Sequence, residues 1–160
     1  MREIDEIASS FLEKNGFIYK RLSWYRQTND FLQIISFQKS SFGNQYYVNI
    51  GESFISNVFS LCSKRLPPES QFQLRARASQ LFNKESFACL DFDNDYQQDK
   101  RIEQIGIICD KCLLFLQSIN SVKSFLANYP NHKKDIFEKV MITKAFFDLL
   151  ELYIELPKGC

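Results

Sequence analysis

Glycine, proline and histidine are scarce in this chain of 160 residues. It contains five Gly, four Pro and one His, and its longest apolar run is the five residues from Cys112 to Leu116. So little Gly and Pro excludes a collagen-like or low-complexity protein, and so short an apolar run excludes a membrane-spanning helix. The first six residues lack the basic and apolar regions of a signal peptide, so we expect no export signal and no membrane association.

Groupings that carry metal, redox or phosphate chemistry are missing or incomplete. The five cysteines are an odd number, which without an export signal favours reduced thiols and a cytoplasmic location. Cys109 and Cys112 form a C-x-x-C, but both fall on the apolar stripe of a helix, where buried thiols are expected. A calcium-like run from Asp91 to Asp95 is not followed by the required Gly and Glu. We therefore expect no cofactor and no metal, and we favour a non-catalytic protein over an enzyme.

Aromatic residues are abundant, at 15% of the chain, and the spacing of apolar residues changes along it. A helical period near the N-terminus gives way after Gly16 to strand-like alternation, and helical spacing returns after Asp99. We expect one α+β domain over residues 1–160: an N-terminal helix, an antiparallel meander of about four strands, and C-terminal helices packed on the sheet. The expected helices cover residues 3–15, 102–119, 121–128 and 134–156, and the expected strands cover residues 17–26, 31–40, 45–55 and 71–77.

The turns between these strands predict two distinct faces of the sheet. Pairing Ser40 with Gln45 across the second turn gathers apolar side chains on one face. Pairing Arg26 with Phe31 across the first turn gives a consistent division, with Trp24 on the apolar face. The other face is either solvated, partly covered by a C-terminal helix, or a binding surface rich in the Tyr and Arg of interface hot spots. Its expected members are Tyr19, Arg21, Tyr25, Leu32, Ile34, Ser36, Gln38, Tyr47, Asn49, Arg75 and Arg77.

Charge is distributed unevenly along a chain whose net charge is +1. Residues 17–77 contain eight Lys or Arg and three acids, a local charge of +5. Residues 85–110 contain seven acids and two bases, a local charge of −5. The two segments either neutralise one another within the fold or leave a basic sheet that attracts an acidic partner.

Short motifs follow one another through the strand region: Gly16-Phe17, Trp24-Tyr25-Arg26, the run Phe37–Ser40, the run Tyr46–Gly51, Arg75-Ala76-Arg77 and the run Leu90–Asp93. In content and order they resemble an uncharacterised bacterial family, domain of unknown function 4304, over about residues 3 to 120. That family has no established activity. Its members are similar in size to the small α+β immunity proteins encoded beside bacterial toxins, so the resemblance implies an immunity-like role.

Two functions of different classes remain open. The favoured one is a non-catalytic protein-binding module whose aromatic and basic sheet face occludes an acidic partner protein, such as a toxin. The alternative is a small anionic-ligand-binding protein or enzyme that uses the same face. Nucleic acid is a less favoured partner, because a pI near 7.6 is low for a protein that must neutralise phosphates. The candidate binding residues are Tyr19, Arg21, Tyr25, Gln38, Tyr47, Asn49, Arg75 and Arg77.

Overall fold

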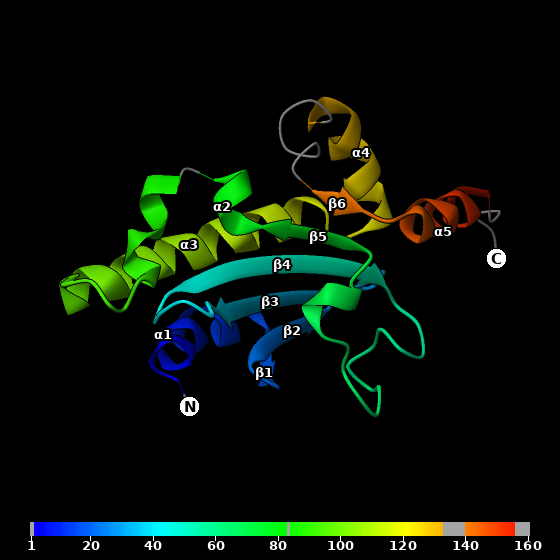
Figure 1. Ribbon diagram of the computed structural model, residues 1–160. Coiled ribbons are helices and arrows are strands. Elements are labelled where there is room, and N and C mark those ends of the chain that lie inside the picture. The colour runs from blue at the N-terminus through cyan, green and yellow to red at the C-terminus, as the bar shows by residue number, and fades with distance from the viewer. Residues whose placement is uncertain (1, 83, 133–139, 156–160) are drawn as a thin grey trace.

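The computed structural model describes residues 2–82, 84–132 and 140–155 (Figure 1). An N-terminal helix precedes a sheet, and further helices follow it, so the predicted α+β class is confirmed. The elements are α1 (Glu3–Leu12), η1 (Glu13–Asn15), β1 (Ile18–Lys20), β2 (Ser23–Gln27), β3 (Phe31–Lys39), β4 (Tyr46–Phe54), η2 (Glu69–Gln71), β5 (Leu74–Arg77), α2 (Ala78–Leu81), η3 (Lys84–Leu90), α3 (Gln98–Ser118), α4 (Val122–His132), β6 (Met141–Ile142) and α5 (Lys144–Glu155).

The strands of the described residues form one six-stranded sheet in the order of the sequence, β1 to β6, and every neighbouring pair is antiparallel. The predicted meander is therefore confirmed, with two more strands than expected. The register of β3 against β4 is the predicted one: Phe31 lies opposite Phe54, and Gln38 lies opposite Tyr47. Because a one-residue slip would exchange the faces, this agreement places the side chains of β3 and β4 on the predicted faces.

The segment predicted as one strand over residues 17–26 is two strands joined by a two-residue turn, Arg21-Leu22. Across this turn Tyr19 lies opposite Trp24. Directly opposed residues share a face, so Tyr19 lies on the apolar face and its predicted position on the polar face is wrong. The turn contains neither Gly nor Asn, the residues that mark such turns in a sequence. The register of β2 against β3 also differs from the predicted one by two residues, with Trp24 opposite Ile35. Because the shift is an even number of residues, the side chains of β2 stay on their predicted faces.

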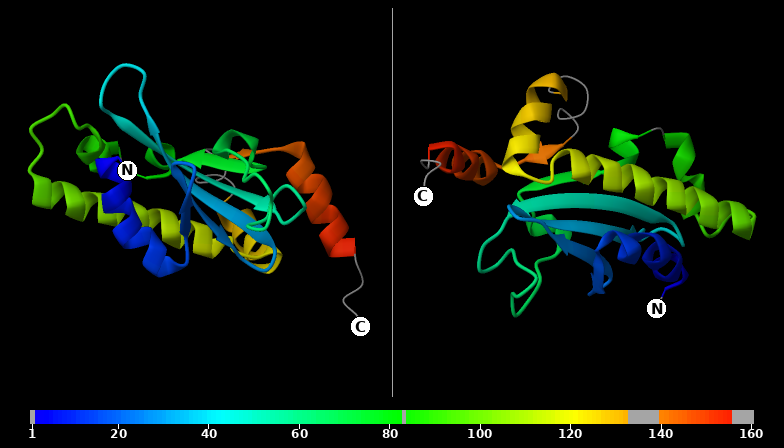
Figure 2. Two further views of the ribbon diagram at one scale, coloured as in Figure 1. Left: turned by 90° about the horizontal axis from the view of Figure 1, so that it is seen from below. Right: turned by 180° about the vertical axis from the view of Figure 1, so that it is seen from behind.

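The apolar face packs against α1 and the long α3, which runs along the sheet (Figure 2). Trp24 and Ile35 of the sheet and Leu12 of α1 are fully buried there. Cys109 and Cys112 of α3 are buried in the same core, as their helical positions predict. Burial raises the pKa of Cys112 to about 12, so the C-x-x-C contributes packing and not reactive thiolate.

The opposite face has a covered part and an open part. The connection between β4 and β5, residues 55–72, folds back over the sheet (Figure 1). Tyr25 is only 1% exposed, and its hydroxyl donates to the carbonyl oxygen of Pro67 at 3.0 Å. Tyr25 thus lies on the predicted face but beneath a cover, which comes from this connection and not from a C-terminal helix. The small core under the cover consists of Tyr25, Leu32, Ile34, Leu66 and Phe72.

The C-terminal region differs from the helix predicted over residues 134–156. Of that range, residues 134–139 and 156 lie outside the described residues, and the described part contains β6, which pairs with β5, and α5. Phe146 of α5 is fully buried in the main core and stacks on Phe31. Among the described helices, none is alone long and apolar enough to cross a bilayer. Only α3 and α4 taken together, bent by 98°, reach that length and composition.

A polar network is buried between the apolar face and α3. The Gln33 side chain donates to the Glu52 carboxylate at 2.7 Å and to the Leu116 carbonyl at 3.0 Å, and it accepts from Arg26 at 2.9 Å. The second carboxylate oxygen of Glu52 has no partner among the described residues. Burial raises the pKa of Glu52 well above its ordinary value. The folded chain therefore keeps a proton that the unfolded chain releases.

We expect the free energy of unfolding to fall as pH rises above the ordinary carboxyl pKa of 4.5, because only the unfolded state then loses the Glu52 proton. One proton gives a limiting slope of about 1.4 kcal/mol per pH unit. The Glu52→Gln variant keeps an acceptor for Gln33 but cannot ionise, so its profile should be flatter and its stability at pH 8 higher. Urea unfolding between pH 5 and pH 8 measures both; an unchanged slope in the variant would contradict this assignment.

Candidate functional site

An open cleft lies on the uncovered part of the polar face. It consists of two adjoining hollows with volumes of about 540 and 590 Å³. Gln38 and Asn49 of the sheet and Glu69 of η2 line both hollows and so form the boundary between them. The first, here called the turn hollow, lies between the Arg21-Leu22 turn and residues 65–70. The second, here called the edge hollow, lies beside β5, α2 and β6.

The floor of the cleft is a polar row that crosses four strands. Ser23, Ser36, Asn49 and Arg77 are successive cross-strand partners from β2 to β5. Residues in such a row lie side by side on one face. The Asn49 amide donates to the Gln38 side-chain oxygen at 3.0 Å. The alternation of β3 and β4 that buries the main core therefore also builds this hydrogen-bonding floor.

The charged side chains that line the cleft are mostly cationic. Among the described residues that line it, Glu69 is the only acid, and burial raises its pKa although Arg75 and Arg77 oppose the shift. Within the described residues only Arg2 forms a salt bridge, with Asp5. The other cleft cations form no salt bridge with the described residues of the acidic segment 85–110. The cleft therefore keeps an excess of positive charge, which attracts anions. The six lining cations are Arg2, Arg21, Lys39, Arg65, Arg75 and Arg77.

The two arginines of β5 have different surroundings. Arg75 donates to the Ser70 carbonyl at 2.8 Å and contacts the sulfur of Met141, so it ties η2 and β6 to the sheet. Arg77 lies over the ring of Tyr47, with 4.4 Å between the guanidinium carbon and the ring centroid. This stacking orients Arg77 without using its N–H groups. Arg77 is therefore the arginine of the edge hollow that is free to bind a ligand.

The turn that supplies Arg21 to the cleft is strained. Arg21 and Leu22 have φ angles of 54° and 61°, the left-handed backbone that a two-residue hairpin turn requires. For residues with a Cβ this conformation costs of the order of 1–2 kcal/mol each. Both side chains line the turn hollow, and Leu22 is 55% exposed. Strain of this kind is concentrated at functional sites, which supports the turn hollow as a binding site.

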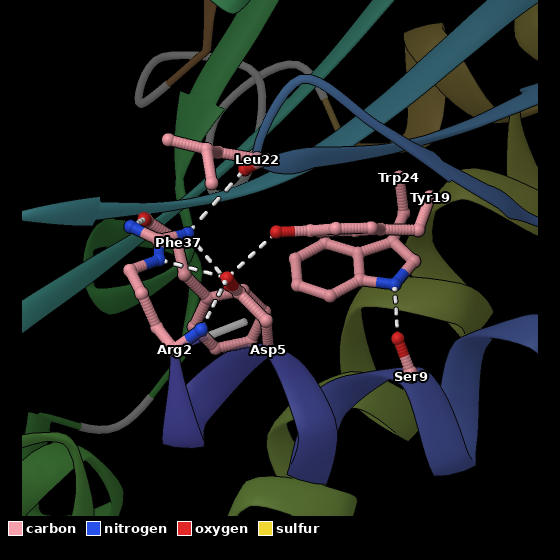
Figure 3. Close-up of polar contacts among 7 residues, drawn as sticks. All are labelled: Arg2, Asp5, Ser9, Tyr19, Leu22, Trp24 and Phe37. Carbon is pink, nitrogen blue, oxygen red and sulfur yellow. Dashed lines mark hydrogen bonds and ion pairs between the residues drawn. The ribbon is translucent and has the colours of Figure 1, made fainter.

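A partly buried ion pair, Arg2–Asp5, connects the strained turn to the N-terminal helix (Figure 3). Arg2 binds both carboxylate oxygens of Asp5, at 2.9 and 2.6 Å, and donates to the Phe37 carbonyl at 3.0 Å. It also donates to the carbonyl of Leu22 at 3.5 Å and lies over the ring of Tyr46. Asp5 is fully buried and also accepts from the Tyr19 hydroxyl at 2.7 Å. Arg2 thus joins α1 to β3 and to the strained turn, and it also lines the turn hollow.

This network accounts for Tyr19, which was predicted as a binding residue. Its ring lies against Trp24, with 4.9 Å between the ring centroids, and its hydroxyl is held by Asp5 (Figure 3). Burial and the Asp5 carboxylate raise the pKa of Tyr19 to about 12. Tyr19 therefore supports the turn from the core side and does not contact the cleft.

The structure brings six of the eight predicted binding residues together in the cleft: Arg21, Tyr25, Gln38, Asn49, Arg75 and Arg77. Tyr47 supports Arg77 from below, and Tyr25 is buried at one wall. Among the lining residues that sequence reasoning missed are Arg2, Leu22, Lys39, Arg65 and Glu69. Pro67-Pro68 indicates that regular secondary structure is interrupted near Arg65 and Glu69. No local pattern shows that this connection folds over the sheet.

The described residues contain no group of three or more His, Cys, Asp or Glu side chains placed to hold a metal ion. In the segment that resembles a calcium loop, Asp93 instead accepts a hydrogen bond from the backbone of Asn44 at 2.7 Å. This contact fixes the β3–β4 turn to the segment before α3. The acidic run therefore has a structural role.

Comparison with known families is consistent with the short motifs of the strand region. Residues 8–110 match the family described as Domain of unknown function (DUF4304). The chain belongs to the DUF4304 family. The match includes the sheet from β1 to β5, and therefore most of the cleft, whereas α4, β6 and α5 lie beyond it. No curated protein and no solved structure matches the chain.

We expect the strained turn to lower stability. Replacing it with the residues that favour its backbone, Arg21→Asn with Leu22→Gly, should raise the free energy of unfolding by about 1–2 kcal/mol. Urea unfolding measures the change, and Leu22→Ala, which keeps a Cβ at the same φ, is the control that should give no gain. A loss of stability in the Asn-Gly variant would show instead that contacts of Arg21 and Leu22 outweigh the strain.

Proposed function

We propose that this DUF4304 protein is a non-catalytic protein-binding module whose cleft receives an acidic segment of a partner protein and so occludes it. The observation that carries the proposal is a set of four lining arginines, Arg21, Arg65, Arg75 and Arg77, that form no salt bridge among the described residues. Guanidinium groups bind carboxylates through forked, charge-assisted hydrogen bonds. An immunity-like protein that binds a toxin within the cytoplasm would act in this way, and we include that role in the proposal.

Two further features support a binding surface over a solvated face. The Arg21-Leu22 turn presents an exposed leucine beside an arginine at the cost of backbone strain. Arg77 is oriented by Tyr47 before any ligand arrives. Orientation in the free protein reduces the entropy lost on binding. Arg and a nearby apolar side chain are also the combination expected of an interface hot spot.

The volumes of the hollows favour a second candidate, a small anionic ligand. Each hollow falls within the range of about 300–1,000 Å³ that is usual for small-molecule sites. Such sites are mostly apolar and enclose their ligands, whereas this cleft has a polar floor and opens along the sheet. We therefore rank this candidate second.

An affinity pull-down from the lysate of the native cells, read by mass spectrometry, tests the proposal. Wild type is compared with an Arg65→Glu, Arg77→Glu variant, which reverses one charge in each hollow and leaves the structural Arg75 intact. We expect a partner that wild type retains and this variant loses. A variant with the same change in net charge, Lys100→Glu with Lys123→Glu, alters exposed positions outside the cleft and should retain it.

The outcomes separate the two candidates. Loss of the partner from both charge variants would show that net charge alone governs binding and would contradict a site in the cleft. If no partner is retained, thermal-shift measurements with nucleotides, phosphorylated metabolites and organic acids test the second candidate. That candidate predicts a rise in melting temperature for wild type and none for the Arg65→Glu, Arg77→Glu variant. Circular dichroism establishes beforehand that each variant is folded.

A further inference from the structure

We propose that the cleft selects a two-part acidic segment, with one acidic side chain in each hollow and neutral residues between them. This inference rests on the proposed function, because it specifies the partner of the same cleft. It arises from the division of charge along the cleft: cations stand at both ends, and Glu69 stands in the middle.

The two ends of the cleft carry separate anion-binding groups. Arg21 and Arg65 are exposed in the turn hollow, and neither has a hydrogen bond or ion pair from its guanidinium group to another described residue. Arg77 in the edge hollow lies over the ring of Tyr47 and within electrostatic range of Glu69, and its guanidinium group forms no hydrogen bond or salt bridge with another described residue. All three guanidinium groups therefore retain their donors for carboxylates of a ligand.

The middle of the cleft disfavours a negative charge. Glu69 lines both hollows and is half-buried, and its carboxylate has no hydrogen-bond partner among the described residues. An acidic side chain placed beside it would meet a like charge in a partly desolvated site, which is unfavourable. Gln38 and Asn49 offer neutral groups at the same place, since their mutual hydrogen bond leaves the Gln38 amide nitrogen and the Asn49 oxygen available. These atoms suit the backbone of a peptide.

The sheet sets the distance between the two acidic positions. Ser23, at the turn hollow, and Arg77, at the edge hollow, are three strand spacings apart along the polar row. Strands are separated by about 4.8 Å, so the two ends lie about 14 Å apart. An extended peptide rises about 3.3 Å per residue, and four residues therefore span this distance. We infer two acidic residues four positions apart, with one position of tolerance for the length of the arginine side chains.

A uniformly charged ligand fits this pattern less well. A nucleic-acid strand places a phosphate at every nucleotide, and a polyglutamate run places a carboxylate at every residue, so each would set charge against Glu69. A segment with neutral central residues avoids that repulsion and still uses both groups of cations. The position of Glu69 thus makes spacing, and not only total charge, the basis of selection.

Selection from a displayed library of random 12-residue peptides tests this inference directly. The library is selected on the immobilised full chain after depletion on the Arg65→Glu, Arg77→Glu variant, so that only cleft-dependent peptides remain. We expect enrichment of sequences with two Asp or Glu three to five positions apart and neutral residues between. For a synthetic peptide of this kind, bringing the two acids together should weaken binding at least tenfold, measured by fluorescence polarisation at fixed ionic strength.

Glu69→Gln provides the matched protein control, because it removes the central charge and keeps the shape of the side chain. In this variant, peptides with adjacent or central acids should bind less than threefold more weakly than the peptide with spaced acids. Enrichment of contiguous acidic runs or of single acids that bind in the cleft would overturn the two-part inference and leave the proposed function standing. If the only enriched sequences also bind the Arg65→Glu, Arg77→Glu variant, or if no sequence is enriched, the two-part inference and the proposed function are both overturned. The comparison between peptides on wild type tests the spacing even if Glu69→Gln fails to fold.

Discussion

The fixed pairing of β3 with β4 determines which side chains the molecule buries and which it leaves in the cleft. Nine opposed pairs, from Phe31–Phe54 to Lys39–Tyr46, set alternate residues on opposite faces. One set buries the main core beneath α1 and α3. The other set holds Gln38 and Asn49, the floor that both hollows share. A slip of one residue would exchange the sets and remove core and cleft together, so the constraint that stabilises the fold also positions the site.

The polar face of the sheet has an apolar part that must be covered and a polar part that lines the cleft. Leu32 and Ile34 of β3 need cover from water, whereas Ser36 of β3 and Asn49 of β4 on the same face are polar and line the cleft. The connection over residues 55–72 covers the apolar part and ends at η2, where Glu69 reaches the open part. At the other side, the Arg2–Asp5 pair holds the strained turn of Arg21 in place (Figure 3). Burial of the Asp5 carboxylate is costly in itself, and its pairing with Arg2 fixes one wall of the cleft.

The predictable features are those that depend on local pattern. Alternation and a turn rich in Ser, Gly and Asn were sufficient for the β3–β4 register, and the helical stripe of α3 was sufficient for the burial of Cys109 and Cys112. The Arg21-Leu22 turn was missed because its sequence contradicts the usual turn residues and is tolerated only through tertiary support. Tyr19 was assigned to the wrong face for the same reason. Arg65 and Glu69 could not be placed, since their position depends on how an irregular connection folds over the sheet.

The central claim is that the cleft arginines that form no salt bridge among the described residues bind anionic groups. The most direct measurement follows the side-chain Nε–Hε signals of the arginines by NMR during titration with a capped peptide that carries two glutamates four positions apart. Its glutamine counterpart at the same ionic strength is the reference. The account predicts selective shifts for Arg21, Arg65 and Arg77 and none for Arg101, which is buried and held by backbone carbonyls away from the cleft. Shifts spread evenly over all arginines, or equal shifts with the glutamine peptide, would contradict it.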